Sequence, residues 1–283
     1  MSLAVSTQPR ARTAGWQVGL VVTLVLVLAA FASVVWTPYP VQSVDAAAIM
    51  QPPTNSHLLG TDGLGHDVLS LLLRGMLTSF VVAAVAVAVG AVIGVPLGLA
   101  AAGWGAVADA FVRAIGGYIA IVTAFALAAL LALRFGPSPG TAMVALGFGM
   151  VPAFVAATRA TLRAAPRHGY AVAAQLAGAL PLEIVRRYSL PAFTRAIGAE
   201  MVAQLAVGVL GEAALAFVGL GATAPATSLG LMLREAQQGA AGQPMLVVAP
   251  GLLLLVIVLA LSITSRGLRA QGAVPASGAT DAA

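Results

Sequence analysis

Six long apolar runs constrain what this chain can fold into. Crossing the hydrocarbon core of a bilayer takes roughly 20 apolar residues. Charged residues make up only 8% of the chain, against about 25% in soluble domains. The sequence therefore predicts an all-α, polytopic membrane protein with six transmembrane helices. The expected spans lie at about 15–36, 77–102, 113–133, 141–158, 196–218 and 244–265.

The first run follows two arginines and could be read as a secretory signal, since Ala30 and Ala32 give a small-x-small pattern. Its apolar length is about 20 residues, longer than the roughly 7–15 of a signal peptide. We therefore expect it to be a retained span.

Two missing residue types exclude several chemistries. All 14 basic residues are arginine, so the chain has no lysine for a Walker-type phosphate loop or a Schiff base. It also has no cysteine, which excludes disulfides, thiol catalysis and thiolate metal sites. The chain is not expected to be an enzyme. Its energy must come from a gradient or from a separate subunit.

The arginines predict the orientation. With both termini in the cytoplasm, eleven of the 14 lie on the inner side and only Arg74, Arg134 and Arg234 lie outside. Cytoplasmic loops of membrane proteins carry the excess of positive charge. We expect a multi-pass protein of a bacterial inner membrane with both termini inside.

The spans divide the chain into three parts. Residues 1–76 form the cytoplasmic N-terminus, the first span and an external loop. Residues 77–271 form the core transmembrane domain with an internal loop at 159–195. Residues 272–283 are rich in Ala, Gly and Ser and are expected to be a disordered cytoplasmic tail.

The second span carries a stripe of small residues. Gly90, Gly94 and Gly98 recur every four residues, which places them on one helix face where a neighbouring backbone can approach closely. We interpret the stripe as helix packing, with a gating hinge as the alternative. Pro96 lies within the stripe and is expected to bend the helix.

The external loop contains "HLLGTDGLGHDVLSLLLRG", residues 57–75. Thr61 or Asp62 is expected to cap an amphipathic helix that lies at the outer surface and runs into the second span. His57 and His66, with Asp62 and Asp67, suggest a metal site, but nothing in their spacing fixes two of them on one ion. We expect polar caps and no metal.

The internal loop contains "YAVAAQLAGALPLEIVRRYSLP", residues 170–191. Small residues recur at helical spacing, which predicts a helix with one face of little side-chain bulk. Gly178 interrupts this helix, and Pro181 is well placed in the first turn of a second helix. The segment predicts a basic helix–turn–helix that inserts into a partner; a loop resting on anionic lipid headgroups is the alternative. The residues expected to couple to this partner are Tyr170, Ala173, Ala174, Ala177, Gly178, Ala179, Glu183 and Arg187.

This segment resembles the EAA motif of ABC importer permeases, with Val172 in place of its leading Glu. Residues 57–70 resemble the external signature of the dipeptide, oligopeptide and nickel permeases, except that His66 replaces an Arg. "GEAALAFVGLGATAPATSLGLMLREA", residues 211–236, resembles the same family's segment before the last span. Together the three stretches are similar to the second, C-type permease of such importers, with a type I fold.

Glu212 lies about 15 residues into the fifth expected span. An ionisable side chain at that depth predicts a functional role. With Gly219 and Gly221 it is expected to position the outer gate. Direct contact with the substrate, or a hydrogen bond to the Gly219–Gly221 turn near the outer interface, are the alternatives.

The resemblance implies a permease that forms the translocation path with a homologous second permease. Two separate ATPase subunits would bind ATP and Mg²⁺ and dock on the internal loop, which holds the family's coupling helix. An external binding protein would deliver di- or oligopeptides, or a chelated metal such as nickel. The chain itself would hold no cofactor and bind no nucleic acid, and its remaining contacts would be with membrane lipid.

Two other classes remain as alternatives. A gradient-driven secondary transporter or channel would need ionisable residues near the bilayer midplane, and the spans offer only Glu212 and, near the inner edge, Glu200. A structural membrane subunit without transport would leave the loop motifs unexplained.

Overall fold

The chain is helical wherever a computed structural model describes it, apart from the connecting segments. The described residues are 11–41, 43, 45, 48–101, 118–164, 190–239 and 243–272. Their helices are α1 (Ala11–Ala32), α2 (Val68–Ala100), α4 (Tyr118–Phe135), α5 (Pro139–Ala164), α8 (Leu190–Val218), α9 (Leu229–Gly239) and α10 (Met245–Gly272). The tail at 273–283 and most of the internal loop lie outside the described residues.

Five of the six expected spans are helices long and apolar enough to cross a membrane within the described part of the chain: α1, α2, α5, α8 and α10. The expected span at 113–133 corresponds to α4, a helix of 18 residues that includes the apolar segment Ala124–Phe135. The all-α prediction is confirmed. The count of six spans agrees with the structure only if α4 is included.

The amphipathic helix predicted in the external loop does run into the second span: one continuous helix, α2, extends from Val68 to Ala100. At 33 residues it is about 50 Å long, well beyond the roughly 30 Å of a hydrocarbon core. The internal loop is shorter than predicted, because α5 continues to Ala164 and α8 begins at Leu190.

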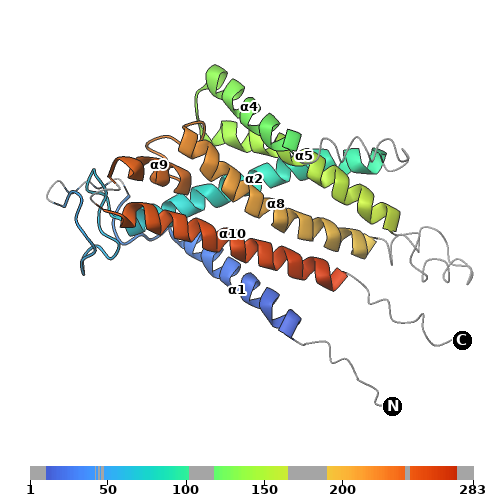
Figure 1. The fold of residues 1–283 in the computed structure, drawn as a ribbon, viewed down its shortest axis with the longest axis horizontal. Helices are drawn as coiled ribbons and strands as arrows, with labels where there is room; N and C mark the ends of the chain where they lie inside the picture. The colour runs from blue at the N-terminus through green and yellow to red at the C-terminus, as the bar shows by residue number, and fades with distance from the viewer. Residues whose placement is uncertain are drawn as a thin grey trace, which may run out of the picture.

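The bundle has two distinct ends (Figure 1). At one end, α4 turns into α5, and α9 lies close to the start of α2 and to residues 48–67. We call this the α9 end. At the opposite end α1 begins, α5 ends, α8 begins and α10 ends.

The glycine stripe of α2 packs against α5. A Cβ atom added at Gly90 would lie 2.8 Å from Cβ of Met150, and one at Gly98 would lie 2.6 Å from Cβ of Thr158. At Gly94 the same atom would lie 2.6 Å from Cβ of Phe154. All three glycines are buried. The two backbones can approach this closely only because the side chains are absent.

Replacing Gly94 by Ala is expected to push α2 and α5 apart. Overfilling a packed contact typically costs about 1–3 kcal/mol, so the purified variant should unfold several degrees below the wild type in a thermal melt. Gly251→Ala in α10 is the matched control, since its new Cβ would meet only Cδ2 of Leu233 at 3.9 Å. Equal melting temperatures for both variants would contradict this packing.

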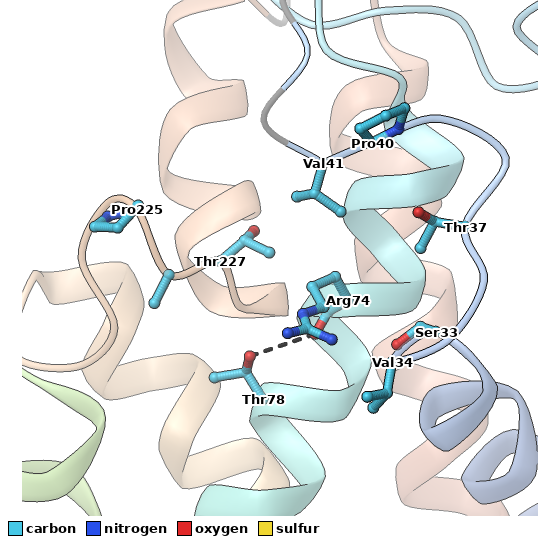
Figure 2. Close-up of a pocket in the computed structure, with 10 residues that line it drawn as sticks. Ser33, Val34, Thr37, Pro40, Val41, Arg74, Thr78, Pro225 and Thr227 are labelled. Atoms are coloured by element: carbon cyan, nitrogen blue, oxygen red, sulfur yellow. Dashed lines mark hydrogen bonds between the residues drawn. The ribbon is translucent and has the colours of Figure 1, made fainter.

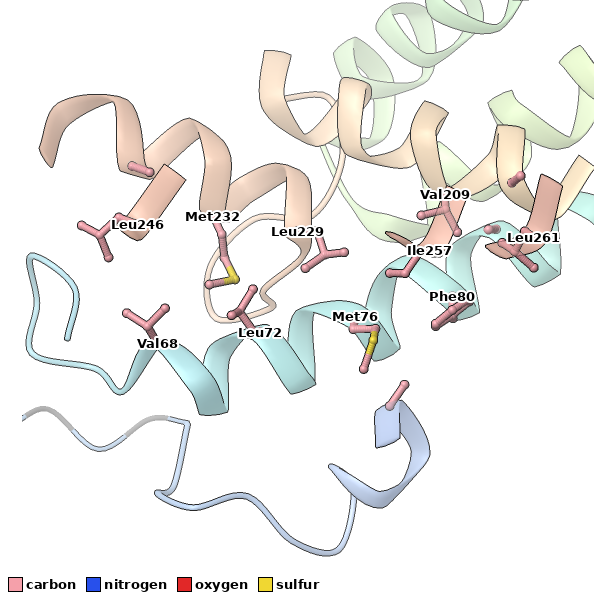
Figure 3. Close-up of a cluster of buried hydrophobic side chains, with 14 residues drawn as sticks. Val68, Leu72, Met76, Phe80, Val209, Leu229, Met232, Leu246, Ile257 and Leu261 are labelled. Carbon is pink, nitrogen blue, oxygen red and sulfur yellow. The ribbon is translucent and has the colours of Figure 1, made fainter. Parts of the chain in front are cut away.

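A buried apolar cluster holds α9 against the long helices (Figure 3). Val68, Leu72 and Met76 of α2 face Leu229 and Met232 of α9. The same cluster continues to Leu246, Ile257 and Leu261 of α10. Side chains on the first turns of α2 are therefore part of the core, whereas the sequence predicted that this part of the helix lies at the outer surface.

Candidate functional site

A buried polar junction joins α2, α8 and the start of α9. The Ser79 hydroxyl of α2 donates a hydrogen bond of 2.6 Å to Oε2 of Glu212 on α8. The backbone N–H of Leu229 lies 3.5 Å from the same Ser79 oxygen. Ser79, Glu212 and Leu229 are each 0% exposed. One hydroxyl of α2 thus contacts two segments that lie 133 and 150 residues further along the chain.

One oxygen of Glu212 has no donor among the described residues. Oε1 is buried without a hydrogen bond, whereas Oε2 is satisfied by Ser79. An unsatisfied buried polar atom costs free energy that a partner would recover. The Ser228 side chain also lies beside the Glu212 carboxyl, so the carboxyl sits between α2 and the start of α9.

The backbones at this junction touch directly. A Cβ atom on Gly75 would lie 3.2 Å from the carbonyl carbon of Ser228, and one on Gly230 would overlap the backbone of Ala213. Ser228 is also 0% exposed, and its hydroxyl accepts from the N–H of Leu231 at 3.3 Å, capping the first turn of α9. We call Ser79, Glu212, Ser228 and Leu229 the α9 junction.

Gly219 and Gly221 lie in the turn that ends α8. Gly219 has φ of +90°, a conformation that other residues rarely adopt, and the guanidinium of Arg234 packs against it. A Cβ atom on Gly221 would lie 2.9 Å from Cα of Ala216. These glycines reverse the chain so that residues 222–228 return toward α2. Glu212 accepts its hydrogen bond from Ser79 and not from this turn.

The polar residues before α2 form two separate pairs. His57 Nδ1 lies 3.0 Å from Asp67, and His66 Nδ1 lies 2.9 Å from Asp62. No cluster of three or more metal-ligating side chains occurs in the described part of the chain. The pairs join residues within one loop and fold it onto the start of α2.

The predicted cap of α2 was the wrong residue. Asp67, and not Thr61 or Asp62, is the N-cap: its carboxylate accepts from the N–H of Ser70 at 2.9 Å and from the Ser70 hydroxyl at 2.7 Å. Asp62 instead caps a local turn, accepting from the N–H groups of Leu64 and His66.

Glu235 of α9 lies on a pocket of about 530 Å³ that Asp62 also lines. Burial raises the pKa of the Glu235 carboxyl above its ordinary value, and the negative charge of Asp62 adds to this. His66 and Arg234 oppose the shift. Because α9 is not one of the candidate spans, this carboxyl titrates outside the membrane-spanning helices.

The raised pKa predicts how pH changes stability. The folded protein holds the Glu235 proton more tightly than the unfolded chain does, so stability should fall as pH rises from near the ordinary pKa of 4.5 through the raised pKa. Glu235→Gln should remove this dependence. The difference in melting temperature between variant and wild type should therefore increase with pH across that window; a constant difference would contradict the prediction.

The predicted coupling residues lie outside the described residues. Tyr170, Ala173, Ala174, Ala177, Gly178, Ala179, Glu183 and Arg187 all fall between 165 and 189. The flanking residues Ala164 and Leu190 lie at the end of the bundle opposite α9. At that end Arg269 of α10 forms an ion pair of 2.7 Å with Glu200 of α8.

Residues 94–270 match the family described as the binding-protein-dependent transport system inner membrane component. This match spans more than half of the chain. The chain belongs to this family. Its match begins within α2 and continues to the last turn of α10, so it includes the α9 junction residues Glu212, Ser228 and Leu229.

Several relatives are similar over nearly the whole chain. The dipeptide transport system permease protein DppC of Escherichia coli K12 is 35% identical over 269 residues, which cover 91% of this chain and 88% of the relative. DppC of Haemophilus influenzae is 28% identical, covering 90% and 88%. The glutathione transport system permease protein GsiD of Pectobacterium atrosepticum is 29% identical, covering 89% and 83%.

The fold is also similar to a solved structure. A chain of the MetNI methionine ABC transporter, from a structure of its inward-facing conformations, gives a TM-score of 0.53 at 22% identity. The match covers 71% of this chain and 95% of that chain. The family and this fold show that the chain is a permease subunit of an ABC importer in the inner membrane. It functions with a second permease and separate ATPase subunits and is not itself an enzyme.

Proposed function

We propose that this permease carries short peptides of the di- and oligopeptide class. The observation that supports this cargo most directly is the 35% identity with a dipeptide permease over 91% of the chain. Other relatives are described as peptide or glutathione permeases. A chelated metal such as nickel was the other cargo that the sequence motifs suggested, and none of these relatives is named for it.

The α9 end faces the outside of the cell in this proposal. Arg195, Arg266 and Arg269 lie on the helix segments at the opposite end, and cytoplasmic segments carry the excess of arginine. Both termini are then cytoplasmic. A binding protein would deliver the peptide to the α9 end, and lipid would cover the apolar outer faces of the spans.

The α9 junction acts as the outer gate. It fastens α9 and the turn at Gly219–Gly221 to α2 through one buried hydroxyl, Ser79. Movement of α2 relative to α8 would break the contact between Ser79 and Glu212 and loosen the start of α9, which the apolar cluster also holds against α2. Glu212 thus positions the gate instead of binding the peptide directly.

Residues 170–191 form the docking site for the ATPases at the other end. Their resemblance to the EAA motif and the position of the flanking helix ends support this placement. ATP and Mg²⁺ would be bound by those ATPase subunits, which would drive the movement that opens and closes the α9 junction.

The direct test is peptide uptake by the complete transporter in proteoliposomes. The chain should be reconstituted with its second permease, its ATPases and its binding protein, and supplied with radiolabelled dialanine. We expect uptake that requires ATP inside the vesicles and stops with a non-hydrolysable analogue. Uptake of nickel without uptake of any peptide would contradict the proposed cargo, and uptake driven by an ion gradient alone would contradict the mechanism.

A further inference from the structure

A second polar feature lies beside the α9 junction. A pocket of about 550 Å³ opens between the end of α1, the segment after it, the first half of α2 and residues 225–227. Figure 2 shows Arg74 projecting from α2 into the space between the 225–227 segment and the end of α1. The sequence placed Arg74 on the outer side but predicted no role for it.

Arg74 supplies the only charge among the residues that line the pocket. Its guanidinium is partly buried, and no described carboxylate lies within ion-pair distance of it. A guanidinium carries five N–H donors in a planar fork that matches a carboxylate or phosphate. Removing part of its hydration without supplying an anion is costly, so the pocket suits a negatively charged group.

Four hydroxyl groups line the pocket around Arg74, and their hydrogen bonds show which of them can donate to a bound anion. Ser33, Thr37 and Thr78 already donate to backbone carbonyl oxygens of residues 30, 39 and 74. Thr227 is the lining hydroxyl for which the described residues supply no acceptor. Arg74 and Thr227 therefore present donors from two sides of the pocket, α2 and the segment that leads into α9.

The pocket is continuous with the α9 junction. Arg74 is followed by Gly75, which contacts the backbone of Ser228, and Thr227 directly precedes Ser228. An anion held between Arg74 and Thr227 would therefore join the same two segments that the junction joins. Its arrival or release would change how tightly α9 is held against α2.

We propose that this pocket binds the C-terminal carboxylate of the peptide cargo as it enters at the α9 end. Arg74 forms the ion pair and Thr227 donates the accompanying hydrogen bond. Apolar side chains of Val34 and Val41 on the pocket wall accept the peptide's carbon atoms. This inference rests on the proposed function, because it takes the cargo to be a peptide with a free carboxylate.

The test compares dialanine with its C-terminal amide, which lacks the carboxylate. Equilibrium binding of each would be measured on the purified transporter complex in detergent without the binding protein. We expect the wild type to bind the acid about tenfold more tightly than the amide, as a charge-assisted hydrogen bond predicts. Arg74→Gln should reduce this ratio to about one, Arg74→Lys should restore part of it, and Thr227→Val should lower it about threefold.

Arg134→Gln is the matched control, since Arg134 lies near the Phe135 ring at the end of α4 and lines no part of this pocket. It should leave the ratio unchanged. Equal affinity of the wild type for acid and amide, or a ratio that survives Arg74→Gln, would overturn the proposal. So would loss of a co-purified phospholipid in Arg74→Gln with no change in the ratio, because the pocket would then bind a lipid phosphate.

Measuring dialanine uptake by the same transporter distinguishes a failure of the carboxylate site from a failure of the proposed cargo. If the wild-type transporter takes up dialanine while the acid-to-amide ratio is unaffected by Arg74, only the carboxylate site is wrong. If the transporter neither binds nor takes up any peptide, the proposed cargo is wrong and the carboxylate site is overturned with it.

Discussion

Removing the Ser79 hydroxyl should open the α9 junction. In Ser79→Ala the buried Oε2 of Glu212 loses its donor and the N–H of Leu229 loses its nearest acceptor. Leaving such groups unsatisfied costs about 1–3 kcal/mol, which corresponds to a shift of about 5- to 150-fold between closed and open junctions. The chain contains no cysteine, so Ser228→Cys provides a single reporter at a position that is 0% exposed in the wild type.

The measurement is the rate at which a membrane-impermeant maleimide labels this cysteine. Ser79→Ala should accelerate labelling by about 5- to 150-fold. Thr78→Val is the control, because Thr78 donates to the carbonyl of Arg74 in its own helix and does not touch Glu212. Slow labelling in both variants would show that the junction does not hold α9 closed.

Glu212→Gln tests whether the negative charge matters or only the hydrogen bond. A glutamine can still accept from Ser79, so a role limited to packing predicts nearly normal uptake. We expect uptake to fall because the amide removes the negative charge and turns one acceptor into a donor at a position that is 0% exposed. An unchanged uptake rate would show that the Glu212 charge is not needed for transport and that the residue acts only in packing.

Ala174→Arg should abolish ATP-driven uptake. If residues 170–191 insert into the ATPases, the added side chain places an unpaired charge in a buried contact, which costs about 3–5 kcal/mol. That is a loss of more than about 100-fold in affinity for the ATPases. The protein should still insert into the membrane, because the substitution lies outside every predicted span.

Peptide uptake and the amount of ATPase that co-purifies should both be measured for this variant. Ala174→Ser serves as its control, since a small hydroxyl fits the same space and should leave both quantities near the wild-type values. Normal uptake by Ala174→Arg would contradict the assignment of this segment as the docking site.

Patterns confined to one helix were predictable from the sequence. Apolar runs located the long helices, and the spacing of Gly90, Gly94 and Gly98 located a close helix contact. Its partner, α5, was not predicted: Met150 and Phe154, which face the stripe, are ordinary residues of an apolar helix, and Gly147, which packs against Val89 of α2, is a single glycine without a repeat.

Contacts between distant segments were not predictable. Glu212 was identified because a carboxyl deep in a span is unusual, but its partner Ser79 is one hydroxyl in a long apolar helix and lies 133 residues away. The pocket at Arg74 combines residues from four segments. The cap of α2 was missed for a different reason: Thr61, Asp62 and Asp67 are all plausible caps, and the tertiary packing of Val68 and Leu72 decides which one is used.

The central claim is that this chain is a permease driven by separate ATPases. The most direct measurement is purification of the tagged chain from its native membranes in mild detergent, with mass spectrometry of the proteins that accompany it. The account predicts a second permease and ATPase subunits in the eluate, with the ATPases lost from Ala174→Arg. A chain that purifies alone, in cells whose cargo uptake survives ATP depletion, would contradict it.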